Sequence, residues 1–400
     1  MKTKIAILGA GPAGLTVANA LLKRGIRDFL VLEKESKVGG LCRSTIVDDS
    51  PFDISGGHFL DTRNAVVNNF LFSFLPCEEW NQFTRDSKIS LFGRFISSPL
   101  EANIWQLDKP EQERYLHDIS VAGCNTHTPK PEKFIDWIYW KLGAAIANDY
   151  MIPYNKKMFG DDLNQLGTYW LNKLPNVSYA DTLHSCQVGK AMGSQPAHAK
   201  FLYPKRFGYG ELWLRMGKAI ENCLIRDYEV CALDISSRTI NDDICADIII
   251  NTIPLPSIKT IDGLPSDLAS DMACLKHTSI DVEYVPTTVD TTAHWIYIPN
   301  ESAPEHRWLV RGNFIKGAKG YWKETRLQRS HPEPRATHFI SNYAYPLNTI
   351  GKNEYMARLT DVLKAHRIYL LGRWGEWQHY NSDVVVEHAL NLSAKLAMSI

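Results

Sequence analysis

Several classes of protein are excluded by what this sequence lacks. None of its eight cysteines pairs with another at CxxC spacing, which argues against a zinc site or a redox dithiol and favours reduced thiols. Lys and Arg together number 44, as do Asp and Glu, so the charge balance favours neither nucleic acid nor an anionic membrane as a partner. No apolar run reaches the ~18 residues of a membrane span, and a predicted strand begins at once. We therefore expect a cytoplasmic protein with no signal peptide, no membrane span and no metal site.

Aromatic residues are the feature that stands out in an otherwise ordinary composition. The 400 residues suffice for two or three packed domains, and the hydrophobic share of 44% is usual for a soluble globular protein. The 11 Trp and 17 Tyr, several of them clustered, favour a site where flat ligands or sugars stack.

The N-terminal segment carries a dinucleotide-binding pattern. Lys4–Leu8 is an apolar run typical of a buried parallel strand, Gly9–Gly14 has the form GxGxxG, and Leu15–Arg24 follows as a predicted helix. These glycines allow a tight turn and the close approach of a pyrophosphate, which the helix N-terminus stabilises. A second predicted strand, Phe29–Leu32, ends at Glu33, near the ~20-residue spacing of a ribose-binding carboxylate. The predicted contacts are Gly9, Gly11, Pro12, Ala13, Gly14, Glu33 and Lys34.

A second glycine pair indicates which dinucleotide binds. Gly39, Gly40 and Leu41 follow Glu33 closely, and the arrangement resembles the extended motif of the FAD-binding family that includes the amine oxidases and protoporphyrinogen oxidase. In that family the paired glycines let the backbone approach the cofactor. We therefore expect FAD rather than NAD, with Gly40 and Leu41 among its contacts. A plain Gly-Gly turn is the alternative.

The whole pattern predicts an α/β protein. A discontinuous Rossmann-like FAD-binding domain would carry an inserted helical domain and an antiparallel β-sheet substrate domain. The FAD-binding domain is expected from residues 1–64, 185–255 and 365–400, the helical domain from 98–184, and the sheet domain from 65–97 and 256–364.

Four further segments carry secondary-structure expectations outside the dinucleotide motif. Lys133–Met151 is apolar on one face and rich in Trp and Tyr, which predicts a helix. Ile280–Val285 and His294–Ile298 alternate between apolar and polar residues, which predicts an antiparallel sheet. Gly317–Pro334 is basic and interrupted by proline, so we expect an exposed loop.

Motifs in register along most of the chain resemble the UDP-galactopyranose mutase family. They are Asp53–His58, Pro131–Phe159, Trp295–Tyr297 followed by Arg307 and Asn313, Ala344–Leu347, and Gly372–Gly375 followed by Asp383. The resemblance implies an isomerase that interconverts the pyranose and furanose forms of a nucleotide sugar, UDP-galactose first, with N5 of reduced FAD as the nucleophile at the anomeric carbon. NAD(P)H could serve as reductant in the same cleft. The oligomeric state stays open, with a homodimer as one alternative.

The resemblance also implies roles for individual residues. Arg307 would clamp the substrate diphosphate, and Tyr297 and Tyr345 would bond phosphate oxygens. His58 would lie near flavin N5, and Arg373 would contact the FAD diphosphate or the substrate. Further cofactor contacts would be Gly57, Gly372 and Asp383, and further substrate contacts Tyr150, Tyr154, Asn155, Phe159, Lys173, His379 and Tyr380. A salt bridge for Arg307 and core packing for the tyrosines are the ordinary alternatives.

The sequence departs from the family pattern at several substrate positions. Lys173 stands near the place of a second diphosphate arginine, and Phe159 stands where a tryptophan is usual. His379, followed by Tyr380, replaces a tyrosine, and Ser97–Glu101 lacks the residues expected near the base. A different sugar nucleotide therefore stays open. So do an oxidase of the amine oxidase or protoporphyrinogen oxidase type and a flavin-binding protein without turnover.

Overall fold

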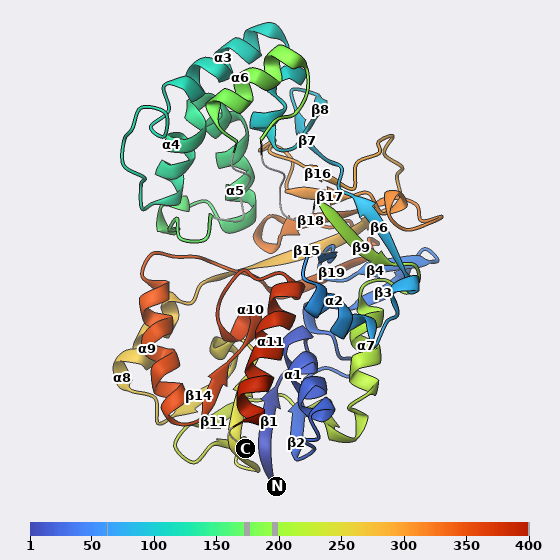
Figure 1. The fold of residues 1–400 in the computed structure, drawn as a ribbon, viewed down its shortest axis with the longest axis vertical. Coiled ribbons are helices and arrows are strands. Elements are labelled where there is room, and N and C mark those ends of the chain that lie inside the picture. Colours follow the sequence, from blue (N-terminus) through green and yellow to red (C-terminus); the bar gives the residue numbers. More distant parts are fainter. Residues whose placement is uncertain (62, 172–176, 194–198, 399–400) are drawn as a thin grey trace.

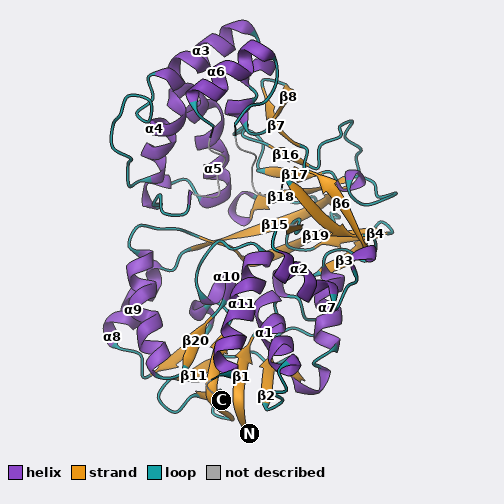
Figure 2. Ribbon diagram, viewed as in Figure 1, coloured by secondary structure: helices purple, strands orange, loops and turns teal. Residues whose placement is uncertain are grey.

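The computed structural model describes residues 1–61, 63–171, 177–193 and 199–398. The molecule is elongated, with both chain ends at the bottom of Figure 1 and a group of helices at the top. Strands from distant parts of the sequence form the middle layer between them (Figure 2).

A sheet of eight strands forms the end of the molecule that holds both termini. Five strands pair in parallel in the order β10 (Leu224–Ile225), β2 (Phe29–Leu32), β1 (Lys2–Leu8), β13 (Ile244–Asn251) and β20 (Ile368–Leu370). The strand β12 (Thr239–Ile240) is antiparallel to β13 and to β11 (Ala232–Asp234), and β14 (Thr260–Asp262) pairs in parallel with β11. Parallel strands covered on both faces carry continuous apolar runs, and Ile5, Ile7 and Leu8 are indeed fully buried. The associated helices are α1 (Pro12–Lys23), α7 (Gly210–Lys218), α8 (Ser266–Asp271), α9 (Lys352–Ala365), α10 (Gly372–Gly375) and α11 (Ser382–Ala397).

A sheet of seven strands forms the middle of the molecule. Its order is β19 (His338–Pro346), β15 (His277–Val285), β18 (Tyr321–Arg326), β17 (Arg307–Leu309), β16 (Trp295–Tyr297), β7 (Ser87–Leu91) and β8 (Arg94–Ser97). Only the β16–β7 pairing is parallel within this order. The strands β15 and β16 lie where the sequence predicts them.

The predicted loop over Gly317–Pro334 is wrong, because β18 lies inside it and pairs with strands on both sides. Trp322 and Glu324 of β18 are fully buried on the inner face. A buried glutamate reads as a polar, solvent-facing position in the sequence, and it therefore hides the alternation that marks a strand.

Smaller β elements join the two sheets. A three-stranded sheet consists of β5 (Leu60–Asp61), β9 (Lys200–Pro204) and β6 (Trp80–Thr84). A separate hairpin consists of β3 (Ser44–Val47) and β4 (Ser50–Asp53). The helix α2 (Ala65–Phe72) follows β5 along the chain. The division of the chain into three domains stays a proposal.

The helical end contains α3 (Lys109–Ser120), α4 (Phe134–Ile146), α5 (Ile152–Phe159) and α6 (Tyr179–Val188). The single helix predicted for Lys133–Met151 is interrupted: Gly143 has φ +74°, and Ala147–Met151 forms a π-helical turn before α5. Glycine tolerates this positive φ. The apolar spacing of the sequence continues across the break, and it therefore did not reveal the interruption.

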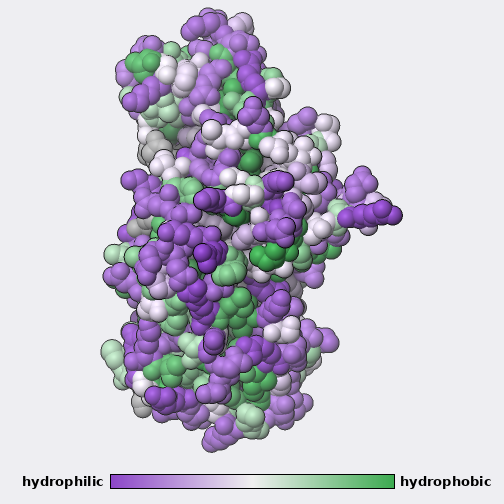
Figure 3. Space-filling view, turned by 90° about the vertical axis from the view of Figure 1, so that its right-hand side faces the viewer, coloured by the Kyte–Doolittle hydropathy of each residue, from purple (hydrophilic) through white to green (hydrophobic). Residues whose placement is uncertain are grey.

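None of the described helices combines the length and the apolar character needed to cross a membrane. On the face in Figure 3, hydrophilic residues dominate and apolar ones appear in small separate groups.

Candidate active site

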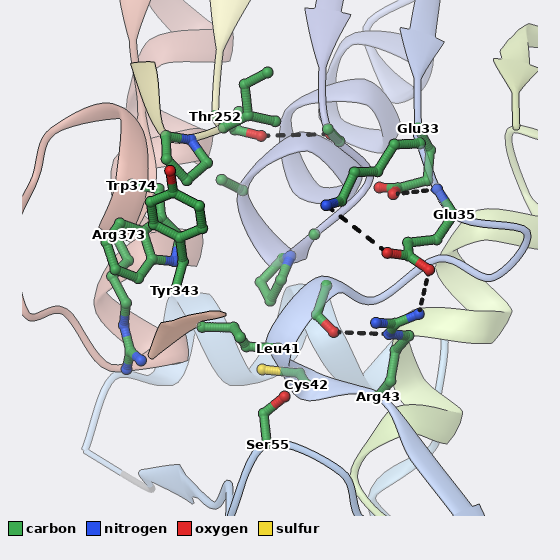
Figure 4. Close-up of a pocket in the computed structure, with 18 of the residues that line it drawn as sticks. Glu33, Glu35, Leu41, Cys42, Arg43, Ser55, Thr252, Tyr343, Arg373 and Trp374 are labelled. Carbon is green, nitrogen blue, oxygen red and sulfur yellow. Dashed lines mark hydrogen bonds and ion pairs between the residues drawn. The ribbon is translucent and has the colours of Figure 1, made fainter. Parts of the chain in front are cut away.

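A cavity of ≈ 300 Å³ lies at the carboxyl ends of three parallel strands of the larger sheet. Gly9 follows β1, Glu33 follows β2, and Thr252 follows β13, and all three line it. Ligands of parallel α/β sheets bind at this edge. In Figure 4, Glu33, Glu35 and Arg43 lie on one side of the cavity and Tyr343, Arg373 and Trp374 on the other.

The glycine loop has the shape of a diphosphate cradle. Gly9 has φ +95°, and a Cβ there would lie 2.7 Å from Ile253 and 2.8 Å from Thr252. A Cβ on Gly11 would instead meet no atom closer than Gly40 Cα at 3.9 Å, so space remains above this residue. Pro12 begins α1, where its missing N–H costs nothing, and the following backbone amides point out of the helix end. The space over Gly11 at a helix N-terminus fits a phosphate group.

Glu33 is fixed at the far edge of this cavity. Its Oε2 accepts a hydrogen bond from the Ala10 amide at 2.7 Å, and its Oε1 accepts one from the Glu35 amide at 2.9 Å. Burial raises the pKa of the Glu33 carboxyl, and these two amides oppose that rise. Glu35 in turn pairs with Arg43 at 3.5 Å. The carboxylate stands where a ribose hydroxyl could donate to it.

Most of the predicted cofactor residues line this cavity. They are Gly9, Gly11, Pro12, Ala13, Glu33, Lys34, Gly40, Leu41, His58 and Arg373. Of the other predicted residues, all of which the structure describes, Gly57 lines a second cavity, and Gly14, Gly372 and Asp383 line neither. Gly14 and Gly372 serve close packing, since a Cβ on Gly14 would overlap the Gly9 carbonyl and one on Gly372 would lie 2.7 Å from Ala13.

Some lining residues were not predicted from the sequence. Tyr228–Val230, Thr252–Pro254, Tyr343 and Trp374 belong to this group. For Thr252 a signal exists, because it directly follows the apolar run of β13, and residues at such strand ends face the ligand edge.

A second cavity of ≈ 160 Å³ adjoins the first. The two share the lining residues Leu41, Ser55, His58, Arg373 and Ser382. Asn381 and Ser382, at the N-terminus of α11, lie at this junction, and the Tyr209 hydroxyl bonds the Ser382 hydroxyl at 2.6 Å. The positive end of the α11 dipole therefore faces the place where the cavities meet.

The second cavity gathers cationic and phenolic side chains from the middle sheet. Arg85, Tyr297, Arg307, Tyr345, Arg373 and His379 line it. Tyr297 of β16 is paired directly with Arg307 of β17 in the register, so both side chains lie on the same face. Arg85, just before β7, was not predicted as a site residue.

A buried carboxylate holds Arg307 in place. The Arg307 Nε donates to Glu324 Oε2 at 2.9 Å, and Nη2 donates to the same oxygen and, at 3.5 Å, to the Tyr345 hydroxyl. Glu324 is fully buried and also accepts from the Gly57 amide at 3.2 Å. Burial alone would raise the pKa of the Glu324 carboxyl, but Arg307 and His306 lower it to about 2. The sequence missed Glu324, because the segment was predicted to be a loop.

His58 lies at the junction as a neutral ring. Its Nδ1 lies 2.8 Å from the Gly56 carbonyl oxygen, which can only accept, so Nδ1 carries the proton and Nε2 does not. Burial, with the nearby Arg373, lowers the pKa of His58 to about 4. At neutral pH the ring is thus a hydrogen-bond acceptor through Nε2.

The depressed pKa of His58 predicts an acid-dependent loss of stability. The pKa of His58 in the folded protein lies below the ordinary value near 6.5. The contribution of its neutral ring to the free energy of unfolding is therefore complete above pH 6.5 and is lost as the pH falls towards 4. The loss should reach about 3 kcal/mol by the linkage between pKa and stability. Urea unfolding at pH 7.5 and 4.5 should show a smaller acid loss for His58→Gln than for the wild type. Equal losses would contradict the prediction.

The guanidinium of Arg373 donates hydrogen bonds to backbone carbonyls. Nε and Nη2 donate to the Tyr380 carbonyl at 3.0 and 2.8 Å, and Nη1 donates to the Ala344 carbonyl at 3.2 Å. The side chain therefore fixes the segment that leads into α11 while it lines both cavities. Tyr380 lines the first cavity, and the His379 ring lies 5.0 Å from the Tyr345 ring beside the second.

Four of the predicted substrate contacts lie in the helical end and line neither cavity. Tyr150, Tyr154, Asn155 and Phe159 are all buried. The Tyr154 ring lies 5.4 Å from the Tyr297 ring, edge to face, and the Asn155 amide donates to its own helix at the Met151 carbonyl. Tyr154 thus reaches the cavity through Tyr297. Lys173 lies outside the described residues.

Comparisons with known proteins agree with this architecture. Residues 7–74 match a family model described as an NAD(P)-binding Rossmann-like domain. An uncharacterized protein in the nifH2 3' region of Methanothermococcus thermolithotrophicus is 51% identical over 72 residues, which cover 17% of this chain and 68% of that protein.

Solved structures match the whole chain. A reduced UDP-galactopyranose mutase superposes with a TM-score of 0.89 at 22% identity, covering 100% of this chain and 95% of that one. A candidate protoporphyrinogen oxidase from Exiguobacterium sp. 255-15 follows with a TM-score of 0.72 at 14% identity, covering 100% and 99%. The predicted α/β fold with a Rossmann-like part is confirmed. The chain belongs to the same family as the uncharacterized Methanothermococcus protein, and its fold is that of the UDP-galactopyranose mutases.

Proposed function

We propose that this protein is an FAD-dependent mutase that interconverts the pyranose and furanose forms of a nucleotide sugar. One observation carries the proposal: Arg85, Arg307 and Arg373 line one small cavity together with the hydroxyls of Tyr297 and Tyr345. Arg307 is held in this set by its ion pair with the buried Glu324. Such a set suits a diphosphate, whose oxygens accept charge-assisted hydrogen bonds.

The first cavity fits FAD on its own residues. The diphosphate would lie over Gly11 at the start of α1, the ribose hydroxyls would donate to Glu33, and the isoalloxazine end would reach the junction at His58. When bound and reduced, FAD supplies a nucleophilic nitrogen for the anomeric carbon, a chemistry that belongs to the cofactor. NAD(P)H is the proposed source of the electrons.

The side chains of the protein would orient the substrate and stabilise the phosphate of the leaving nucleotide. Arg307, held rigid by Glu324, would hold the substrate phosphate close to the junction, so that the sugar lies next to the cofactor. The hydroxyls of Tyr297 and Tyr345 would donate hydrogen bonds to the phosphate oxygens as the nucleotide leaves. The neutral His58, with Nε2 free of its proton, would accept a proton or a sugar hydroxyl hydrogen bond at the junction.

The cavity charge weighs against the alternative of an amine oxidase. An amine substrate reaches such an enzyme as a cation or must lose a proton first, and three guanidiniums would repel it. We therefore rank the oxidase second. UDP-galactose is the first substrate to test, and departures such as Phe159 and His379 leave room for another sugar nucleotide.

The test is an anaerobic assay. The purified protein is reduced with dithionite, mixed with UDP-galactofuranose, and analysed by chromatography for UDP-galactopyranose. We expect conversion by the reduced enzyme and none by the oxidised enzyme. Equal conversion in both states would contradict the proposed mechanism. No conversion by a protein with bound, reducible flavin would reject UDP-galactose as the substrate.

A further inference from the structure

Arg85 occupies a position in the second cavity that no motif in the sequence marks. It lies between β6, which ends at Thr84, and β7, which begins at Ser87. Its Nη2 donates to the Tyr297 hydroxyl at 2.5 Å, and its guanidinium carbon lies 5.0 Å from the centre of the Trp295 ring. Stacking on an aromatic ring together with a hydrogen bond fixes the orientation of the guanidinium plane.

The strand register brings Arg85 and Arg307 to the two sides of one tyrosine. The strand β16 lies between β7 and β17. Tyr297 of β16 pairs with Arg307 of β17, while Trp295, two residues earlier and therefore on the same face, pairs with Ser87 at the start of β7. The chain that precedes Ser87 thus directs Arg85 along this face to the Tyr297 hydroxyl.

The hydrogen-bond directions leave the Tyr297 hydroxyl ready to donate. A phenol can accept from Arg85 and still donate its own proton to a ligand. Arg307 contributes a guanidinium whose charge Glu324 partly balances, and Arg85 adds a second guanidinium to the same wall. The three groups form a continuous row of donors: Arg85, Tyr297 and Arg307.

We propose that Arg85 and Arg307 form a two-arginine clamp for the substrate diphosphate. In this clamp, Arg85 would supply the second guanidinium that the sequence lacks near Lys173. The proposal rests on the proposed function, since it specifies how that site holds its substrate. It places the anion between β7 and β17, on the rigid middle sheet.

The experiment measures binding rather than turnover. Calorimetric titrations with UDP, inorganic pyrophosphate and uridine compare the flavin-loaded wild type with Arg85→Met, Arg85→Lys and Arg94→Met. Arg94 is the matched control, because it lies on the adjacent β8 and pairs with the exposed Asp108 at 2.7 Å, outside the cavity. Flavin content and thermal unfolding show that each variant is folded.

We expect Arg85→Met to weaken the binding of UDP and of pyrophosphate on the order of 10- to 100-fold, as loss of a charge-assisted contact predicts. The affinity of Arg85→Met for uridine, and the affinities of Arg94→Met for all three ligands, should differ from those of the wild type by less than about twofold. Arg85→Lys should recover part of the lost affinity because the charge remains. The salt dependence of UDP binding should also weaken in Arg85→Met.

The outcomes separate the two proposals. If the wild type binds UDP and Arg85→Met binds it equally well, the clamp is rejected and the proposed function stands. A parallel loss of uridine and UDP affinity would assign Arg85 a purely structural role and also reject the clamp. If the wild type binds neither UDP nor pyrophosphate, the proposed function fails, and the clamp fails with it.

Discussion

Replacing Arg307 with methionine is expected to reduce both stability and affinity for UDP. The substitution leaves Glu324 fully buried without its cation, which typically costs about 3–5 kcal/mol of the free energy of unfolding. Loss of the charge-assisted bonds to phosphate should weaken UDP binding on the order of 10- to 100-fold. Urea unfolding and UDP titration measure the two effects separately.

A second substitution separates these two consequences. In the double variant Arg307→Met with Glu324→Gln, the buried group is neutral, and its amide oxygen can still accept from the Gly57 amide. We expect the double variant to recover most of the lost stability and none of the lost affinity. If Arg307→Met is no less stable than Arg94→Met, the buried ion pair does not have the role described above.

Replacing Gly9 with alanine is expected to abolish cofactor binding. The residue has φ +95°, and an added Cβ would lie 2.7 Å from Ile253 and 2.8 Å from Thr252. Left-handed strain of roughly 1–2 kcal/mol and overpacking of roughly 1–3 kcal/mol together would displace the loop. Flavin absorbance per mole of purified protein should fall to near zero.

Gly25→Ala is the matched control for this prediction. Gly25 also has a positive φ, +81°, but an added Cβ would meet nothing within 4 Å. This variant should lose about 1 kcal/mol of stability and keep its flavin. If Gly9→Ala retains flavin as Gly25→Ala does, the crowded glycine loop does not form the cofactor site.

The dinucleotide part of the fold could be predicted because its signals are local. The apolar run of β1, the glycines after it and Glu33 after β2 follow one another within a single β–α–β unit, and each has a steric or electrostatic reason. Tyr297 was also placed in the correct strand, because alternation marks β16, whereas Arg307 was singled out only by the family resemblance. Their joint lining of one cavity then follows from the register.

The groups that support the site could not be predicted, because their roles depend on contacts distant in sequence. Glu324 looks like a solvent-facing charge until β18 is inserted beside β17, where it meets Arg307. Arg85 carries no motif, and only the pairing of β7 with β16 brings it to Tyr297. For Tyr150, periodicity alone could not distinguish a core residue from a substrate contact, and in the structure it is buried.

The two oxygens of Glu324 connect the walls of the cofactor and substrate cavities. One oxygen accepts from the Gly57 amide next to His58, and the other accepts from Arg307. Thermodynamic coupling between two sites is reciprocal. If a ligand at one cavity strengthens one of these bonds at the expense of the other, it changes the binding free energy at the second cavity, and a ligand at the second cavity changes the binding free energy at the first by the same amount. A change of redox state that moves the Gly57 backbone would therefore alter substrate affinity, and substrate binding would shift the reduction potential by the equivalent amount.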